Sequence, residues 1–125
     1  MYTKWISLCL GSLIGGIARY ALAGFVYQSL GSNFPYGILV VNLSGCFLIG
    51  FLNTLAEVKF LLTPNAQILL MVGFCGAFTT FSTLILETSN LIKDGELIKA
   101  LINGLGSLVL GLAVFYLGQI VAKWI

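Results

Sequence analysis

Four hydroxyl side chains gather in the middle of one long apolar stretch, within residues 73–83. They belong to Thr79, Thr80, Ser82 and Thr83. Phe78 and Phe81 flank them, and a phenyl ring has a positive edge. Hydroxyl groups are hydrogen-bond donors, so this segment offers donors and ring edges to a small anion.

Gly73 and Gly76 stand just before these hydroxyls, where the centre of a membrane helix is expected. A broken helix at this depth is tolerated only where it is buried in protein or lines a watery cavity. The ends of its two halves then present free N–H and C=O groups that hold ions. We therefore expect a break here that lines an anion path. The alternative is a continuous helix whose hydroxyls bond back to carbonyls one turn earlier.

Three further polar residues lie inside apolar stretches and need partners. Arg19 is costly in hydrocarbon, at least about 2.5 kcal/mol near a helix centre, so it either serves the path or anchors its helix by reaching toward the interface. Asn42 offers amide donors and an acceptor, either to the path or between helices. Glu87 opposes anion passage if ionised, so we expect it to be partnered, near the exit, or protonated.

The residue types exclude most other chemistry. The chain has no histidine, which removes the commonest general base and metal ligand. The three cysteines, Cys9, Cys46 and Cys75, are odd in number and match no metal or redox spacing. No base–nucleophile pair is recognisable, and we expect no enzyme. Six basic and four acidic residues form no run that would suit nucleic acid.

These residues must be positioned by membrane helices. The chain has 125 residues, of which 59% are hydrophobic and 8% charged, and its mean hydropathy is +1.07. A span needs about 20 mostly apolar residues. We predict a single transmembrane domain, residues 1–125, whose four spans are Trp5–Leu30, Tyr36–Ala56, Ala66–Leu91 and Leu97–Val121. Pro64 suits the first turn of the third helix.

The basic residues are almost evenly divided between the two ends of this bundle. The end with both termini carries Lys4, Lys59 and Lys123, and the opposite end carries Lys93 and Lys99, with Arg19 toward it. Orientation follows an asymmetry of Lys and Arg, and here three face three. We therefore expect insertion in both orientations, which allows two copies to pair antiparallel.

The same segments are similar to those of a known family. The chain resembles the bacterial CrcB proteins, the Fluc fluoride channels, along its whole length. The resemblance is carried by residues 15–20, by residues 37–45 with Asn42, and by residues 73–83 followed by Glu87 and Thr88. The run from Gly73 to Thr83 is highly specific to that family.

The resemblance implies a fold and a function. Fluc channels are antiparallel homodimers of a four-helix, dual-topology subunit in the plasma membrane. They export cytoplasmic fluoride passively through two pores. The third helices break and cross at the two-fold axis, where backbone carbonyls bind a structural sodium ion. By motif position those carbonyls belong to Gly76 and Thr79 in this chain.

The resemblance also assigns roles along the pore. Phe81 is the pore-lining aromatic, and Asn42 donates its amide to the anion. The hydroxyls of Thr80, Ser82, Thr83 and Ser107 extend a polar track, and Arg19 lies near a watery vestibule. One position departs from the family: a second pore phenylalanine is replaced by Leu84, which has no ring edge. Gly111 likewise replaces a frequent hydroxyl in the fourth span.

Two other classes share parts of this pattern. Small multidrug transporters also have four helices and often pair antiparallel, but they couple protons through a carboxylate in the first span. The first span of this chain carries Arg19 and no acid. A membrane scaffold subunit that transports nothing would explain the glycines, and it would leave the hydroxyl-rich segment and Arg19 unexplained.

Overall fold

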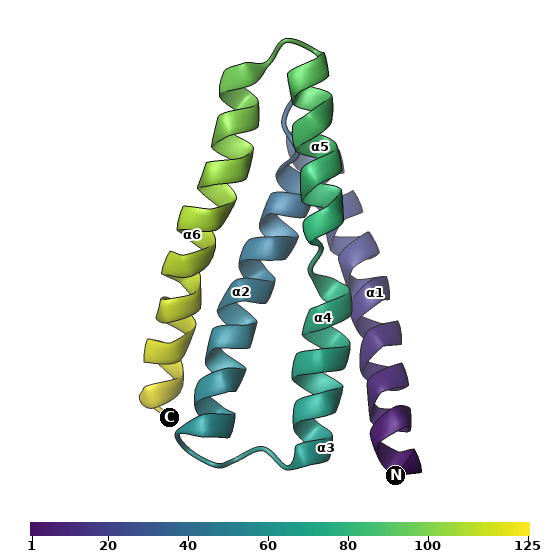
Figure 1. The fold of residues 1–125 in the computed structure, drawn as a ribbon, viewed down its shortest axis with the longest axis vertical. Coiled ribbons are helices and arrows are strands. Elements are labelled where there is room, and N and C mark those ends of the chain that lie inside the picture. The colour runs from purple at the N-terminus through teal and green to yellow at the C-terminus, as the bar shows by residue number, and fades with distance from the viewer.

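The computed structural model describes residues 1–125 as an all-helical chain that passes four times along one axis (Figure 1). The first two passes are α1 (Tyr2–Leu30) and α2 (Tyr36–Glu57). The third is divided into α3 (Pro64–Gln67), the π-helix η1 (Ile68–Cys75), α4 (Gly76–Phe78) and α5 (Phe81–Lys93). The fourth is α6 (Leu97–Lys123).

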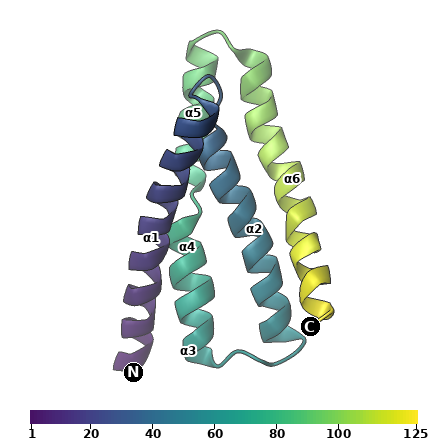
Figure 2. The ribbon, with the colours of Figure 1, turned by 180° about the vertical axis from the view of Figure 1, so that it is seen from behind.

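All four passes are long and apolar enough to cross a membrane. The four predicted spans are confirmed, and the helices extend beyond them by a few residues at most ends. Both termini lie at the same end of the bundle (Figures 1 and 2). Only 21 of 125 residues are buried, so most of the apolar surface faces outward. This is typical of a chain whose surface is covered by lipid or by a second subunit.

The third pass begins as its sequence predicts. Thr63 precedes the helix in an extended conformation, and its hydroxyl oxygen accepts a hydrogen bond from the Ala66 amide at 3.1 Å. Pro64 occupies the first turn, where its missing N–H leaves no intrahelical bond unmade. The wide turns of η1 follow immediately and were not expected from the sequence.

Small residues set how closely the helices approach. A Cβ added to Gly11 or Gly15 of α1 would overlap the backbone of η1, at Leu69 and Phe74. Glycines therefore let α1 lie directly against the third pass. A glycine also allows close packing of α2 against α6, because a Cβ added to Gly50 would overlap the carbonyl oxygen of Phe115. Figure 1 shows α2 between α6 and the third pass.

Candidate functional site

The third pass is interrupted at Thr79 and Thr80. Both residues are extended, with φ −93° and ψ 158° at Thr79 and φ −152° and ψ 119° at Thr80. The helix therefore stops at Phe78 and restarts at Phe81, and Figure 1 shows the link between α4 and α5. This confirms the predicted break and excludes a continuous helix.

Asn42 of α2 pairs with both backbone groups of Thr80. Its Nδ2 donates to the Thr80 carbonyl oxygen at 3.0 Å, and its Oδ1 accepts from the Thr80 amide at 2.9 Å. One side chain thus supplies partners for both backbone groups of Thr80, which stands between the two halves of the helix. The amide retains one unused N–H, because Nδ2 carries two hydrogens. Asn42 therefore joins two helices, and it also lines the groove described below.

Thr80 also caps the second half of the pass. Its Oγ1 accepts from the Thr83 amide at 3.2 Å and donates to the Thr83 hydroxyl at 3.1 Å. The Ser82 hydroxyl lies 3.4 Å from the same atom. An α-helix leaves its first amides without intrahelical partners, and the positive end of its dipole lies there. The hydroxyl cluster therefore stands at a positively polarised helix end.

Arg19 binds the other side of the break. Its Nε donates to the carbonyl oxygen of Ala77 at 3.0 Å, and the residue is half-buried. Ala77 belongs to the last turn before the break, where helix carbonyls lack partners and the dipole is negative. The guanidinium therefore neutralises a helix end and ties α1 to the third pass. Whether it also lines a vestibule stays a prediction.

A groove of about 590 Å³ runs beside the break, between α2, the third pass and α6. Of the residues predicted from the sequence, seven line it: Asn42, Gly76, Thr79, Thr80, Phe81, Leu84 and Ser107. Ser82 is exposed and Thr83 half-buried beside it, joined to it through Thr80. The Phe81 ring is 74% exposed, so a single chain leaves this groove open on its outer side.

Two carbonyl oxygens at the break are suited to hold a cation. In a continued helix the Thr80 amide would bond the Gly76 carbonyl oxygen, but it bonds Asn42 instead, whereas the Thr79 amide keeps its regular helical bond to Cys75. The Thr79 carbonyl accepts no backbone hydrogen bond. Gly76 is exposed, and a Cβ added to it would meet nothing within 4 Å. Exposed carbonyl oxygens of this kind are ligands for hard monovalent cations.

Glu87 lies at the middle of α5 and does not line the groove. Its Oε2 accepts a hydrogen bond from the Tyr27 hydroxyl of α1. Of the three alternatives expected for this carboxylate, the structure therefore places it with a partner. Glu87 also borders a cavity of about 620 Å³ at the end of the bundle opposite the termini, where the α1–α2 and α5–α6 loops lie. Asp94 and Lys99 line the same cavity.

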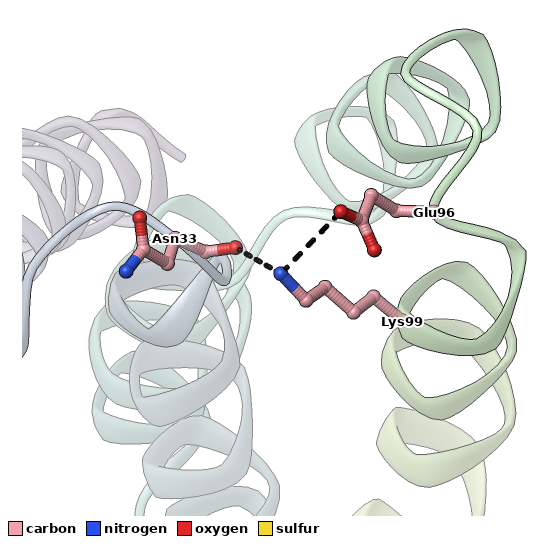
Figure 3. A network of polar contacts seen from close by, with 3 residues as sticks. All are labelled: Asn33, Glu96 and Lys99. Carbon is pink, nitrogen blue, oxygen red and sulfur yellow. Dashed lines mark hydrogen bonds and ion pairs between the residues drawn. The ribbon is translucent and has the colours of Figure 1, made fainter.

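Lys99 holds two loops together at that end, as Figure 3 shows. Its Nζ donates to the backbone carbonyl oxygen of Asn33 at 3.4 Å and lies 3.8 Å from a carboxylate oxygen of Glu96. The contact joins the α1–α2 loop to the start of α6. Exposed ion pairs of this kind contribute little stability, about 0–1 kcal/mol, so the network orients loops more than it stabilises them.

Sequence reasoning missed two polar residues that the fold pairs with side chains of α5. Tyr27 is the partner of Glu87, and Asn103 of α6 donates to Thr88 of α5 at 2.9 Å. The signal for Asn103 was available, because an amide inside a membrane helix must face protein or water. The partners of these residues could not be predicted from the sequence, because Tyr27 and Glu87 are 60 residues apart along the chain, and Asn103 and Thr88 are 15 apart.

Comparison with known proteins shows the family of the chain. A family model described as CrcB-like protein, Camphor Resistance (CrcB), matches residues 6–119. The chain is similar to the Fluoride-specific ion channel FluC of Chlorobium phaeobacteroides, 41% identical over 122 residues, 98% of this chain and 94% of the relative. The protein of the same name from Chlorobaculum tepidum is 48% identical over 113 residues, 90% of this chain and 89% of the relative. The chain therefore belongs to the CrcB-like family.

Proposed function

We propose that this chain is a fluoride channel of the plasma membrane that lets cytoplasmic fluoride leave passively. The relatives of the chain carry the name of fluoride-specific ion channels, and four apolar passes make it a multi-pass membrane protein. The observation that carries the proposal is the break at Thr79 and Thr80, clamped by Asn42 beside a groove. A channel of this class moves an ion and transforms no substrate, so the chain is not an enzyme.

The groove has the chemistry that a small anion requires. Fluoride is strongly hydrated, so its transfer into hydrocarbon is prohibitive unless fixed donors replace water. The unused N–H of Asn42, the hydroxyl of Ser107 and the ring edge of Phe81 are such donors, and all three residues line the groove. Several weak sites in a row let an ion both enter and leave.

The hydroxyls of Ser82, Thr83 and Thr80 supply further donors near the start of α5. They share one network, in which Thr80 donates to Thr83, so their protons can be redirected toward an arriving anion. The positive end of the α5 dipole acts on the same place. Arg19, which has donor groups beyond the one given to Ala77, would stand in the wider vestibule.

A structural sodium ion fits the carbonyl oxygens of Gly76 and Thr79. Both lie at the break, and neither accepts the backbone bond that a continuous helix would supply. Two oxygens from one chain are too few for a cation site, so a second copy would complete it. When bound, the ion supplies a fixed positive charge near the anion path. The role of this chain is to hold the carbonyls at the break, through Asn42 and Arg19.

An antiparallel homodimer would close the outer side of the groove. The near balance of basic residues permits two orientations, and the exposed Phe81 ring needs an apolar neighbour. A proton-coupled multidrug transporter is not favoured, because α1 contains no acidic residue.

The test is fluoride efflux from liposomes loaded with potassium fluoride, started with valinomycin and followed with a fluoride electrode. We expect rapid efflux of fluoride and not of chloride. Phe81→Ile removes the ring edge and should abolish efflux, whereas Phe25→Ile, on an exposed face of α1 away from the groove, should leave it unchanged. Wild-type protein that folds but releases no fluoride would overturn the proposal.

A further inference from the structure

Asn103 is a fully buried amide on a membrane helix whose role the proposed channel leaves open. The residue is 1% exposed. Its Nδ2 donates to the Thr88 hydroxyl oxygen at 2.9 Å, so it joins α6 to α5. Its Oδ1 is buried and accepts no hydrogen bond from the chain. A buried acceptor without a donor is destabilising, so the environment of this atom requires an explanation.

The orientation of the amide is fixed by Thr88. The Thr88 hydroxyl donates its only proton to the carbonyl oxygen of Leu84 at 2.7 Å. Its oxygen can therefore only accept a bond from Asn103, and the group facing Thr88 must be the NH₂ group. Rotating the amide would place two acceptors against each other. Oδ1 therefore points away from Thr88 by necessity.

Ser107 lies one turn farther along α6, on the same helix face. Its Oγ is also shielded from solvent and has no partner in the chain. Gly104 stands between the two residues, and a Cβ added there would meet nothing within 4 Å. Gly104, Ser107 and Thr88 all line the groove. Two unpartnered buried polar atoms therefore lie one turn apart on one face of α6, beside the groove that Ser107 lines.

We propose that Asn103 and Ser107 together hold an ordered water molecule in this wall. A buried water needs room and two to four polar partners, and it has two donors to give. One donor satisfies Asn103 Oδ1 and the other Ser107 Oγ. An anion does not suit the site, because Oδ1 is an acceptor and would repel it. A metal cation would require more oxygen ligands than these two.

The bound water would also affect fluoride conduction by orienting the Ser107 hydroxyl. This step rests on the proposed channel function. When Ser107 Oγ accepts from the water, its own proton is free to point into the groove. Asn103 is then a positioning residue that acts through water on the Ser107 donor. Without the water, the Ser107 proton would turn back toward the carbonyl one turn earlier, as hydroxyls in membrane helices do.

The test is a double-mutant cycle on fluoride efflux with Asn103→Leu and Ser107→Ala. Each single change should slow efflux by about tenfold, the loss expected for one hydrogen bond to a charged group. The double variant should lose no more than Ser107→Ala alone, because Asn103 acts only through Ser107. Losses that multiply to about a hundredfold would overturn the proposal. Asn103→Leu combined with Ser44→Ala, whose hydroxyl bonds the carbonyl of Val40, should equal Asn103→Leu.

Two further measurements separate this proposal from the channel itself. A wild-type protein without efflux would defeat the channel, and the cycle would then be measured on thermal unfolding in detergent, where the same coupling is expected. A high-resolution density map of the wild type should show a peak within hydrogen-bond distance of Asn103 Oδ1 and Ser107 Oγ. A direct bond between the two side chains would refute the bound water, even if Asn103→Leu failed to fold.

Discussion

Asn42 holds the break in the third pass with a single side-chain amide. It satisfies the N–H and the C=O of Thr80 at 2.9 and 3.0 Å, and both groups would otherwise lack partners in an apolar surrounding. The two roles that the sequence left open, a link between helices and a lining of the path, are therefore compatible. The link uses one N–H and the carbonyl oxygen of the amide, and the second N–H remains for a ligand.

Replacing Asn42 by leucine should remove the link and the donor together. We expect the free energy of unfolding to fall by about 2–4 kcal/mol, because two polar groups of Thr80 lose their partners, and fluoride efflux to cease. Asn53→Leu is the matched control, since Asn53 lies on the same helix and takes no part in holding the break. Thermal unfolding in detergent and liposome efflux measure the two effects. An Asn42→Leu protein as stable as the wild type would contradict the clamp.

Leu84 lies one turn after Phe81 and lines the same groove. A leucine has no positive ring edge, so Leu84→Phe should add a site for the anion. We expect fluoride efflux to rise, by up to about tenfold if the ring contributes as aromatic contacts usually do. Leu108→Phe controls for added volume, because Leu108 lines the groove from α6. Equal effects of the two substitutions would show that ring position is unimportant.

The residue types of this site could be predicted from the sequence, and their partners could not. The crowding of hydroxyls and glycines at 73–83 predicted the break, because a broken helix at membrane depth is tolerated only where it is buried in protein or lines a cavity. That Arg19 would donate to Ala77, 58 residues away, depends on how α1 packs on the third pass. The same holds for Asn103, whose neighbours are set by the α5–α6 turn.

At the scale of elements, the two halves of the third pass are held from outside. Arg19 of α1 neutralises the end of the first half, and Asn42 of α2 holds the residue that caps the second. The break is therefore an arrangement of three helices. Hydropathy predicted the ends of the four spans to within a few residues. It could not predict the π-helix Ile68–Cys75, because nothing in these apolar residues distinguishes the wide turns of a π-helix from ordinary helical turns.

Two adjacent glycines test whether close approach of α1 positions the break. A Cβ on Gly15 would overlap the carbonyl oxygen of Phe74, whereas a Cβ on Gly16 would meet nothing within 4 Å. Gly15→Ala should push α1 away and destabilise the protein by about 1–3 kcal/mol. It should also slow efflux, since Arg19 then moves away from Ala77. Gly16→Ala should be neutral or slightly stabilising, because alanine favours helix. Identical unfolding midpoints for the two variants would argue against this packing.

At the scale of the whole molecule, the open groove and the balance of charge lead to the same arrangement. Phe81 is 74% exposed at the groove, so one chain alone cannot seal an ion path from lipid. Three basic residues stand at or toward each end, so neither orientation is favoured. If the channel needs two oppositely inserted copies, forcing one orientation should abolish efflux even though each chain still folds.

Charges added at one end of the bundle test this requirement directly. Val58→Lys with Leu61→Lys raises the count at the terminal end from three to five, against three at the other, and both sites are exposed. Leu97→Lys with Ile98→Lys, also exposed, biases the opposite way. We expect each variant alone to insert in one orientation and to give little efflux. Co-expression of the two should restore efflux, because one supplies the partner that the other lacks. Full efflux from either variant alone would mean that copies of one orientation suffice, and the antiparallel dimer would then be wrong.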